Sequence, residues 1–189
     1  MKNWTFPNLL SFSRLALTPL FVIALLQERP MRALAVFVIA GATDALDGIA
    51  ARWLGQESKL GAVLVPIADK LLLTTAFIML TIPDLYPGLR IPVWVTVLVI
   101  ARDVLILAVS LAMFLSLEVS KFPPIGLSKL NTVAQVVTVL LVLASGFYSG
   151  LETVTQGCFY LVAALTVMTG FYYALRSGKL IEESSDETT

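Results

Sequence analysis

Long apolar runs dominate the sequence and limit what it can fold into. Six of them are long enough to cross a bilayer as helices, because about 20 residues span the hydrocarbon core. Hydrophobic residues make up 58% of the 189 residues and charged residues only 14%, which leaves too little polar surface for a soluble domain. We therefore predict an all-α integral membrane protein with six transmembrane helices. The six runs are residues 9–27, 31–51, 63–83, 91–115, 129–149 and 153–175.

The two ends of the chain differ from its apolar middle. Residues 4–14 mix aromatic and polar side chains, which is typical of a short interfacial helix ahead of the first membrane span. The alternative is a simple helix start with Asn8 near its N-cap. Residues 182–189 are acidic and rich in Ser and Thr, so we expect a disordered tail there. The sequence thus predicts one membrane domain, residues 1–181, followed by that tail.

The basic residues predict an orientation in the membrane. If both termini are cytoplasmic, the outside loops hold Arg29, Arg32 and Arg90, and the inside segments hold more than twice as many basic residues. This distribution favours a multi-pass protein with cytoplasmic termini, in a bacterial inner membrane or its equivalent. The inside residues are Lys2, Arg14, Arg52, Lys59, Lys121, Lys129, Arg176 and Lys179.

Composition excludes several kinds of site. The formal net charge is zero and no basic cluster is present, so we expect no nucleic-acid binding. There is no histidine and a single cysteine, Cys158, which excludes imidazole sites, thiolate clusters and disulfides within the chain. Any bound metal must therefore take oxygen ligands.

Ionisable residues inside the apolar runs are concentrated between residues 44 and 69, a segment that we call the acidic run. Asp44 and Asp47 are three residues apart, so on a helix their carboxylates share a face and can hold one hard cation. Gly48 lets a phosphate or a neighbouring helix approach the backbone. Arg52, about one turn further along, can form forked hydrogen bonds with a phosphate.

The third apolar run completes this pattern. Gly61 leaves the same room for a close approach, and Asp69 lies two turns beyond it, where it can reach the same cavity from a facing helix. Carboxylates, an arginine and a further aspartate are the parts of a phosphoryl-transfer site. The structural alternatives are helix packing for the glycines and ion pairing of Asp69 with Lys70 or Arg52.

The acidic run resembles the signature of the CDP-alcohol phosphatidyltransferase family, D-x2-D-G-x2-A-R, eight residues, G, x3-D, x3-D. The resemblance extends over nearly the whole chain, since the family also has six helices. It implies an enzyme that transfers a phosphatidyl group from CDP-diacylglycerol to an alcohol and releases CMP, and that is typically a homodimer. Seven of the eight fixed positions are present, namely Asp44, Asp47, Gly48, Ala51, Arg52, Gly61 and Asp69.

The resemblance also implies a role for each of these residues, with one exception. Asp44 and Asp47 become ligands of Mg²⁺ or Mn²⁺, Asp69 becomes the general base, and the glycines and Arg52 bind substrate. Val65 stands where the family has a third metal-binding aspartate, and valine has no donor oxygen. We consider three interpretations: a weak or single-metal enzyme, an inactive variant, and a rearranged site. The alternative to an enzyme is a non-catalytic relative that binds lipid.

Later segments bear on the acceptor alcohol. Residues 91–104 and 128–135 are similar to the CMP-forming cardiolipin synthases, whose acceptor is phosphatidylglycerol, and to phosphatidylglycerophosphate synthases, whose acceptor is glycerol 3-phosphate. The latter usually have a second basic residue near Asn131, which favours the cardiolipin synthases here. Arg102 and Lys129 are candidates for binding the acceptor phosphate, with Lys129, Thr132 and Gln135 expected on one helical face. The alternatives are an Arg102–Asp103 ion pair and a snorkelling Lys129.

Overall fold

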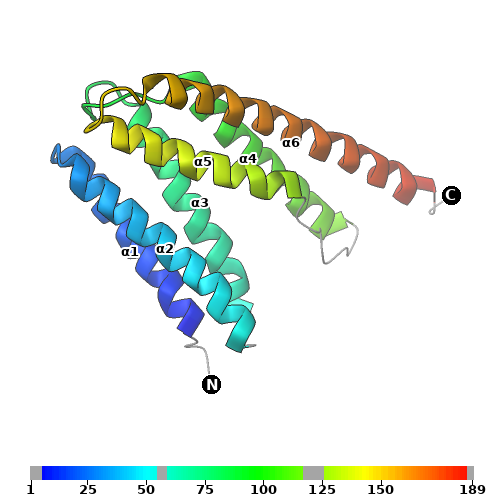
Figure 1. The fold of residues 1–189 in the computed structure, drawn as a ribbon. Helices are drawn as coiled ribbons and strands as arrows, with labels where there is room; N and C mark the ends of the chain where they lie inside the picture. Colours follow the sequence, from blue (N-terminus) through cyan, green and yellow to red (C-terminus); the bar gives the residue numbers. More distant parts are fainter. Residues whose placement is uncertain (1–5, 55–58, 117–125, 187–189) are drawn as a thin grey trace. The chain divides into compact units, whose positions relative to one another are not determined.

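The computed structural model describes the backbone of residues 6–54, 59–116 and 126–186, and the side chains of residues 15–43, 70–108 and 126–173. Six α-helices and no strands are present in these residues (Figure 1). The predicted all-α class is therefore confirmed, and each apolar run corresponds to one helix. The helices are α1 (Phe6–Leu26), α2 (Pro30–Leu54), α3 (Lys59–Thr81), α4 (Val93–Ser116), α5 (Gly126–Ser145) and α6 (Glu152–Asp186).

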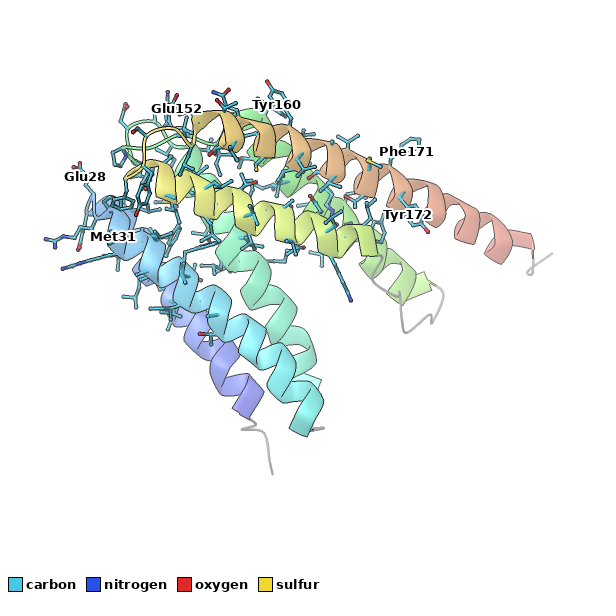
Figure 2. The ribbon with its side chains drawn as sticks, in the orientation of Figure 1. Glu28, Met31, Glu152, Tyr160, Phe171 and Tyr172 are labelled. Carbon is cyan, nitrogen blue, oxygen red and sulfur yellow. The ribbon has the colours of Figure 1, made fainter. Side chains whose placement is uncertain are left out.

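Two helical segments with described side chains are long and apolar enough to cross a membrane, Gly126–Ser145 and Glu152–Tyr173. Shorter apolar helical segments are Leu15–Leu26, Pro30–Thr43 and Lys70–Thr81. Every helix exposes large apolar side chains; in α6, Tyr160 and Phe171 are 68% and 64% exposed and point away from the helix (Figure 2). An apolar outer surface of this kind suits contact with lipid.

The beginning of the chain corrects one expectation. Helix α1 runs without a break from Phe6 to Leu26, so in the described residues no separate interfacial helix precedes the first apolar run. Pro7 does not interrupt the helix because a proline in the first turn removes no helical hydrogen bond. Asn8 lies within the first turn of α1 and not ahead of it.

The end of the chain differs from expectation as well. Helix α6 continues to Asp186, so residues 182–186, which the sequence predicts to be disordered, are helical. Glu182 and Glu183 have a high helix propensity, and no proline follows Gly178 to end the helix. Residues 187–189 of the predicted tail lie outside the described residues.

The chain forms two compact units. Unit 1 comprises Met1–Ile91 and Val139–Thr153, and unit 2 comprises Pro92–Thr138 and Val154–Thr189. In unit 1, α1 packs against both α2 and α3 (Figure 1). The rings of Phe21 and Phe37 lie between α1 and α2, with centroids 5.8 Å apart.

The turn between α1 and α2 satisfies the backbone groups that both helix ends leave unpaired. The amide of Arg29 donates to the carbonyl of Ala24, and that of Glu28 donates to Leu25, both at 3.0 Å. Glu28 has a left-handed backbone, φ 54°, as the corresponding position of a Schellman motif requires. The Arg29 carbonyl then accepts from Ala33 at 3.1 Å, and Pro30 takes the first helical position, where its missing N–H costs nothing.

The connection between α3 and α4 is anchored by a buried tyrosine. The hydroxyl of Tyr86 donates to the carbonyl of Leu143 near the end of α5, and the amide of Leu89 donates to Oγ of Ser145 at 2.8 Å. Gly146 lies directly against the Tyr86 ring, where a Cβ atom would overlap the hydroxyl. Burial raises the pKa of Tyr86 to about 12, although a hydrogen bond with the Gly146 backbone opposes this shift.

Unit 2 is built on α4, α6 and the first part of α5. The rings of Trp94 in α4 and Tyr160 in α6 pack with centroids 5.9 Å apart. Buried positions on α6 recur every three or four residues, as expected for a helix that packs along one face. The positions with this spacing are Thr155, Phe159, Val162, Thr166, Thr169 and Tyr173, and Leu165 beside Thr166 is buried as well.

Replacing Tyr86 with Phe tests whether its hydroxyl anchors this connection. The change leaves the buried Leu143 carbonyl without its donor, so we expect the free energy of unfolding in detergent to fall by about 1–2 kcal/mol. Thermal unfolding followed by circular dichroism measures the change. Tyr148→Phe is the control: Tyr148 is exposed, so its change should stay within about 0.5 kcal/mol.

The raised pKa of Tyr86 adds a pH dependence with a defined sign. Between its ordinary value near 10 and about 12, the folded chain keeps this proton while the unfolded chain releases it. The stabilisation is therefore complete below pH 10 and is lost as the pH rises from 10 to 12. Equal losses of stability in the original chain and in Tyr86→Phe over this window would contradict the assignment.

Candidate functional site

The acidic run lies on two consecutive helices of unit 1, α2 and α3, and the four-residue connection between them, residues 55–58, is outside the described residues. The side chains of the run also lie outside the described residues. The structure therefore gives only the positions of these residues along α2 and α3. Four predicted site residues are in α2 and three positions are in α3: Asp44, Asp47, Gly48 and Arg52, then Gly61, Val65 and Asp69.

Helical register sets the spacing of these positions. Helix α2 is continuous from Pro30 to Leu54, so Asp44 and Asp47 occupy neighbouring positions less than one turn apart. In α3, Gly61, Val65 and Asp69 recur every four residues and follow one side of the helix. An aspartate at position 65 would therefore stand one turn from Asp69.

The donor chemistry of the acidic run fits a hard divalent cation. Mg²⁺ and Mn²⁺ prefer carboxylate oxygens, and the neighbouring positions of Asp44 and Asp47 supply two such groups. Val65 supplies none. Where side chains are described, no group of three or more His, Cys, Asp or Glu residues gathers. The residues present thus suit a site with two protein carboxylates in α2.

Arg102 is the centre of a second polar region, in unit 2. Its side chain is only 5% exposed, and each guanidinium nitrogen donates a hydrogen bond. Nη1 contacts a carboxylate oxygen of Asp103 at 2.8 Å, Nη2 donates to Oγ of Ser128 at 2.6 Å, and Nε donates to Oγ1 of Thr169 at 3.3 Å. The Arg102–Asp103 ion pair, one of the two alternatives from the sequence, is confirmed, and Arg102 joins α4, α5 and α6.

Two buried amides on α5 extend this polar region. Asn131 and Gln135 are 0% and 1% exposed, and they lie one turn apart on the same side of the helix. Oδ1 of Asn131 accepts from the Thr166 hydroxyl at 3.3 Å. Nδ2 of Asn131 and both polar atoms of Gln135 have no hydrogen-bond partner among the described residues. Each such atom costs about 1–3 kcal/mol when buried unpaired.

Lys129 has a different environment from the residues expected beside it. Its side chain is exposed, Thr132 is half-buried and Gln135 is buried, so the three do not line one face as the sequence suggested. The reason is helical geometry: positions 129 and 135 are six residues apart, which separates them by about 120° around the helix. The buried stripe of α5 instead contains Asn131, Gln135 and Thr138.

Sequence reasoning missed the contribution of α6. Thr166 and Thr169 contact Asn131 and Arg102, respectively, although the sixth apolar run was assigned no polar role. The available signal was the three-residue spacing of these threonines within a run of apolar residues, because a helix places such positions side by side.

Comparison with known proteins identifies the family. The model of the CDP-alcohol phosphatidyltransferase family matches residues 4–171. This range includes the whole acidic run and the polar region around Arg102.

Comparison with individual proteins agrees with this family match. The chain is 34% identical over 192 residues to the cardiolipin synthase (CMP-forming) of Rattus norvegicus and 32% identical to that of Homo sapiens. Each alignment covers 93% of this chain but only 62% of the relative. The chain is also 34% identical to the CDP-diacylglycerol--glycerol-3-phosphate 3-phosphatidyltransferase of Cereibacter sphaeroides, covering 93% of this chain and 80% of the relative. The resemblance seen in the acidic run is thus confirmed: the chain belongs to the CDP-alcohol phosphatidyltransferase family.

Proposed function

We propose that this chain transfers a phosphatidyl group from CDP-diacylglycerol to phosphatidylglycerol, forming cardiolipin and releasing CMP. One observation carries the proposal: seven of the eight positions of the family signature lie at the right spacing on two consecutive helices, α2 and α3. The names of the rat and human relatives agree with this activity.

The reaction is a direct displacement at phosphorus. Asp69 takes the proton of the acceptor hydroxyl, and the oxygen attacks the β-phosphorus of CDP-diacylglycerol. A new O–P bond forms as the bond between that phosphorus and the bridging oxygen breaks, and CMP leaves with the bridging oxygen. Arg52 binds a phosphate of the substrate, while Gly48 and Gly61 let the pyrophosphate approach both helices.

Mg²⁺ or Mn²⁺ would be held by Asp44 and Asp47. When bound, the cation neutralises the charge that develops on the phosphate oxygens. The two carboxylates otherwise repel each other in an apolar setting. Their neighbouring positions therefore favour a shared cation over two separate structural roles.

The polar region around Arg102 supports phosphatidylglycerol as the acceptor. Arg102 is paired with Asp103, and the nearby buried residue at position 131 is a neutral asparagine. A phosphodiester with one negative charge needs less positive charge than the phosphate monoester of glycerol 3-phosphate. The exposed Lys129 would bind this phosphodiester, while Arg102, whose three nitrogens already donate within the protein, would hold Ser128 and Thr169 in position. Glycerol 3-phosphate is the second candidate, supported by the Cereibacter sphaeroides relative and its fuller coverage.

The membrane arrangement is part of the proposal. Six transmembrane helices, cytoplasmic termini and a homodimer follow from the apolar runs, the basic residues and the family. The exposed apolar side chains on every helix support immersion in lipid. A site near the inner interface gives the acyl chains hydrocarbon and gives the cytidine and pyrophosphate water.

Replacing Asp69 with Asn tests the activity and its base together. The original chain, purified in detergent with Mg²⁺, should release CMP from CDP-diacylglycerol when phosphatidylglycerol is added. Asn cannot accept the proton, so we expect kcat to fall by about 10²–10⁴-fold. The measurement is CMP release followed by chromatography.

Asp84→Asn is the matched control, since Asp84 is exposed in the connection after α3 and should leave kcat unchanged. Glycerol 3-phosphate is offered in a parallel reaction. Absence of CMP release with either acceptor from the original chain would contradict the proposal and favour a non-catalytic lipid-binding relative.

Replacing Val65 with Asp tests the departure from the family signature. The change adds a carboxylate one turn from Asp69, so the Mn²⁺ concentration for half-maximal activity should fall about tenfold or more. Val65→Leu adds no oxygen and should leave this concentration unchanged. Excess EDTA should abolish activity in all three chains. If only Val65→Asp is active, the original chain is an impaired variant; if Val65→Asp binds Mn²⁺ no better, position 65 does not face the metal.

A further inference from the structure

Helix α3 contains a proline in its interior, close to the positions of the family signature. Pro66 lies between the ends of the helix at Lys59 and Thr81, and the helix is continuous across it. Proline has no N–H, so the carbonyl of Ala62, four residues earlier, lacks the hydrogen bond that a regular helix would give it. In an apolar surrounding this oxygen needs another partner, because lipid offers no hydrogen bonds in place of the missing one.

The freed carbonyl belongs to the side of α3 that carries the signature positions. Positions 62, 65, 66 and 69 follow the pattern i, i+3, i+4 and i+7, which defines one side of a helix. Helical carbonyls point toward the C-terminal end of their helix, so the Ala62 oxygen is directed to the turn that contains Val65. A backbone oxygen is thus available on the side of α3 where Val65 has no donor atom.

This turn of α3 lies level with the carboxylates of α2. At about 1.5 Å per residue, Asp47 is about 10 Å before the end of α2 at Leu54, and Val65 is about 9 Å after the start of α3 at Lys59. The two helices run in opposite directions and both pack against α1 within unit 1 (Figure 1). Positions 47 and 65 therefore have nearly the same height in the helix pair.

The neighbouring sequence offers few other partners for this oxygen. Residues 60–69 contain no serine, threonine, asparagine, glutamine or basic residue. Between Asp44 and Leu54, the side chains with an N–H group are those of Arg52 and Trp53. A cation is a different kind of partner, and peptide carbonyls are hard oxygen ligands that suit Mg²⁺ and Mn²⁺ as carboxylates do.

We propose that the carbonyl oxygen of Ala62 is a ligand of the cation held by Asp44 and Asp47, in place of the carboxylate that Val65 does not supply. This inference rests on the metal site of the proposed function and adds a third protein oxygen, from α3. Interrupted helices of membrane transporters use backbone carbonyls in the same way to coordinate Na⁺. Pro66 takes no part in the reaction; it keeps the oxygen free of the helical hydrogen bond.

Replacing Pro66 with Ala tests the inference, because alanine restores the N–H that pairs with the Ala62 carbonyl. Binding of Mn²⁺ to the full chain in detergent, without substrate, is measured from the electron paramagnetic resonance signal of free Mn²⁺. We expect Kd to rise about tenfold or more. Thermal unfolding in EDTA should shift to a higher temperature in Pro66→Ala, since alanine favours a helix far more than proline. Loss of the fold therefore does not account for the weaker binding.

Pro19→Ala is the matched control. Pro19 lies in the interior of α1, a helix without carboxylates, so this change should leave the Kd for Mn²⁺ unchanged. Adding Val65→Asp to Pro66→Ala returns a third oxygen and should restore the affinity to within about threefold of the original chain.

An unchanged Kd in Pro66→Ala would overturn the inference and assign the Ala62 carbonyl to a donor such as Arg52. An original chain that binds no Mn²⁺ would overturn it as well. CMP release is measured separately on the same chains. A rise of Kd in Pro66→Ala without CMP release from the original chain would support the carbonyl ligand and refute the transferase activity.

Discussion

A polar side chain inside a helix bundle with an apolar outer surface has no water to bind, so it needs a partner in the protein or a ligand. The described interior of this chain follows that constraint closely. Arg102 uses all three of its nitrogens, and Thr138 and Thr169 donate to carbonyls of their own helices. The hydrogen bonds of these buried polar groups thus connect α4, α5 and α6. Among the described residues, the buried side-chain atoms left without a partner are Nδ2 of Asn131 and both polar atoms of Gln135.

The two polar regions of the chain, the acidic run and the region around Arg102, differ in their charge. The acidic run of α2 and α3 concentrates carboxylates, which attract cations and can take a proton. The region around Arg102 combines a paired charge with neutral amides and hydroxyls, which suits an alcohol. In the proposed function, the acidic run holds the metal, binds the pyrophosphate and takes the proton.

Much of the fold could be predicted from the sequence because each helix is a continuous apolar run between breaks at Pro, Gly and charged residues. The family could be predicted because its signature is local to two helices. Helix ends were less predictable: the interfacial segment merges into α1, and α6 extends to Asp186, since propensity alone does not show where a helix stops.

Interactions between helices were the least predictable part of the candidate site. The Arg102–Asp103 pair was foreseen because the two residues are adjacent in sequence. The contacts of Arg102 with Ser128 and Thr169 join helices that are far apart in sequence, and no local pattern encodes them. The different exposures of Lys129 and Gln135 depend on which face of α5 packs inward, and this is decided by the neighbouring helices.

A direct competition between the two acceptors is the most decisive measurement. The purified chain is incubated with CDP-diacylglycerol, Mg²⁺ and equal concentrations of phosphatidylglycerol and glycerol 3-phosphate, and the lipid products are identified by mass spectrometry. We expect cardiolipin as the main product, in amounts equal to the CMP released. Phosphatidylglycerophosphate as the main product would contradict the assignment of phosphatidylglycerol as the acceptor, and the absence of both lipids and of CMP would contradict the transferase activity itself.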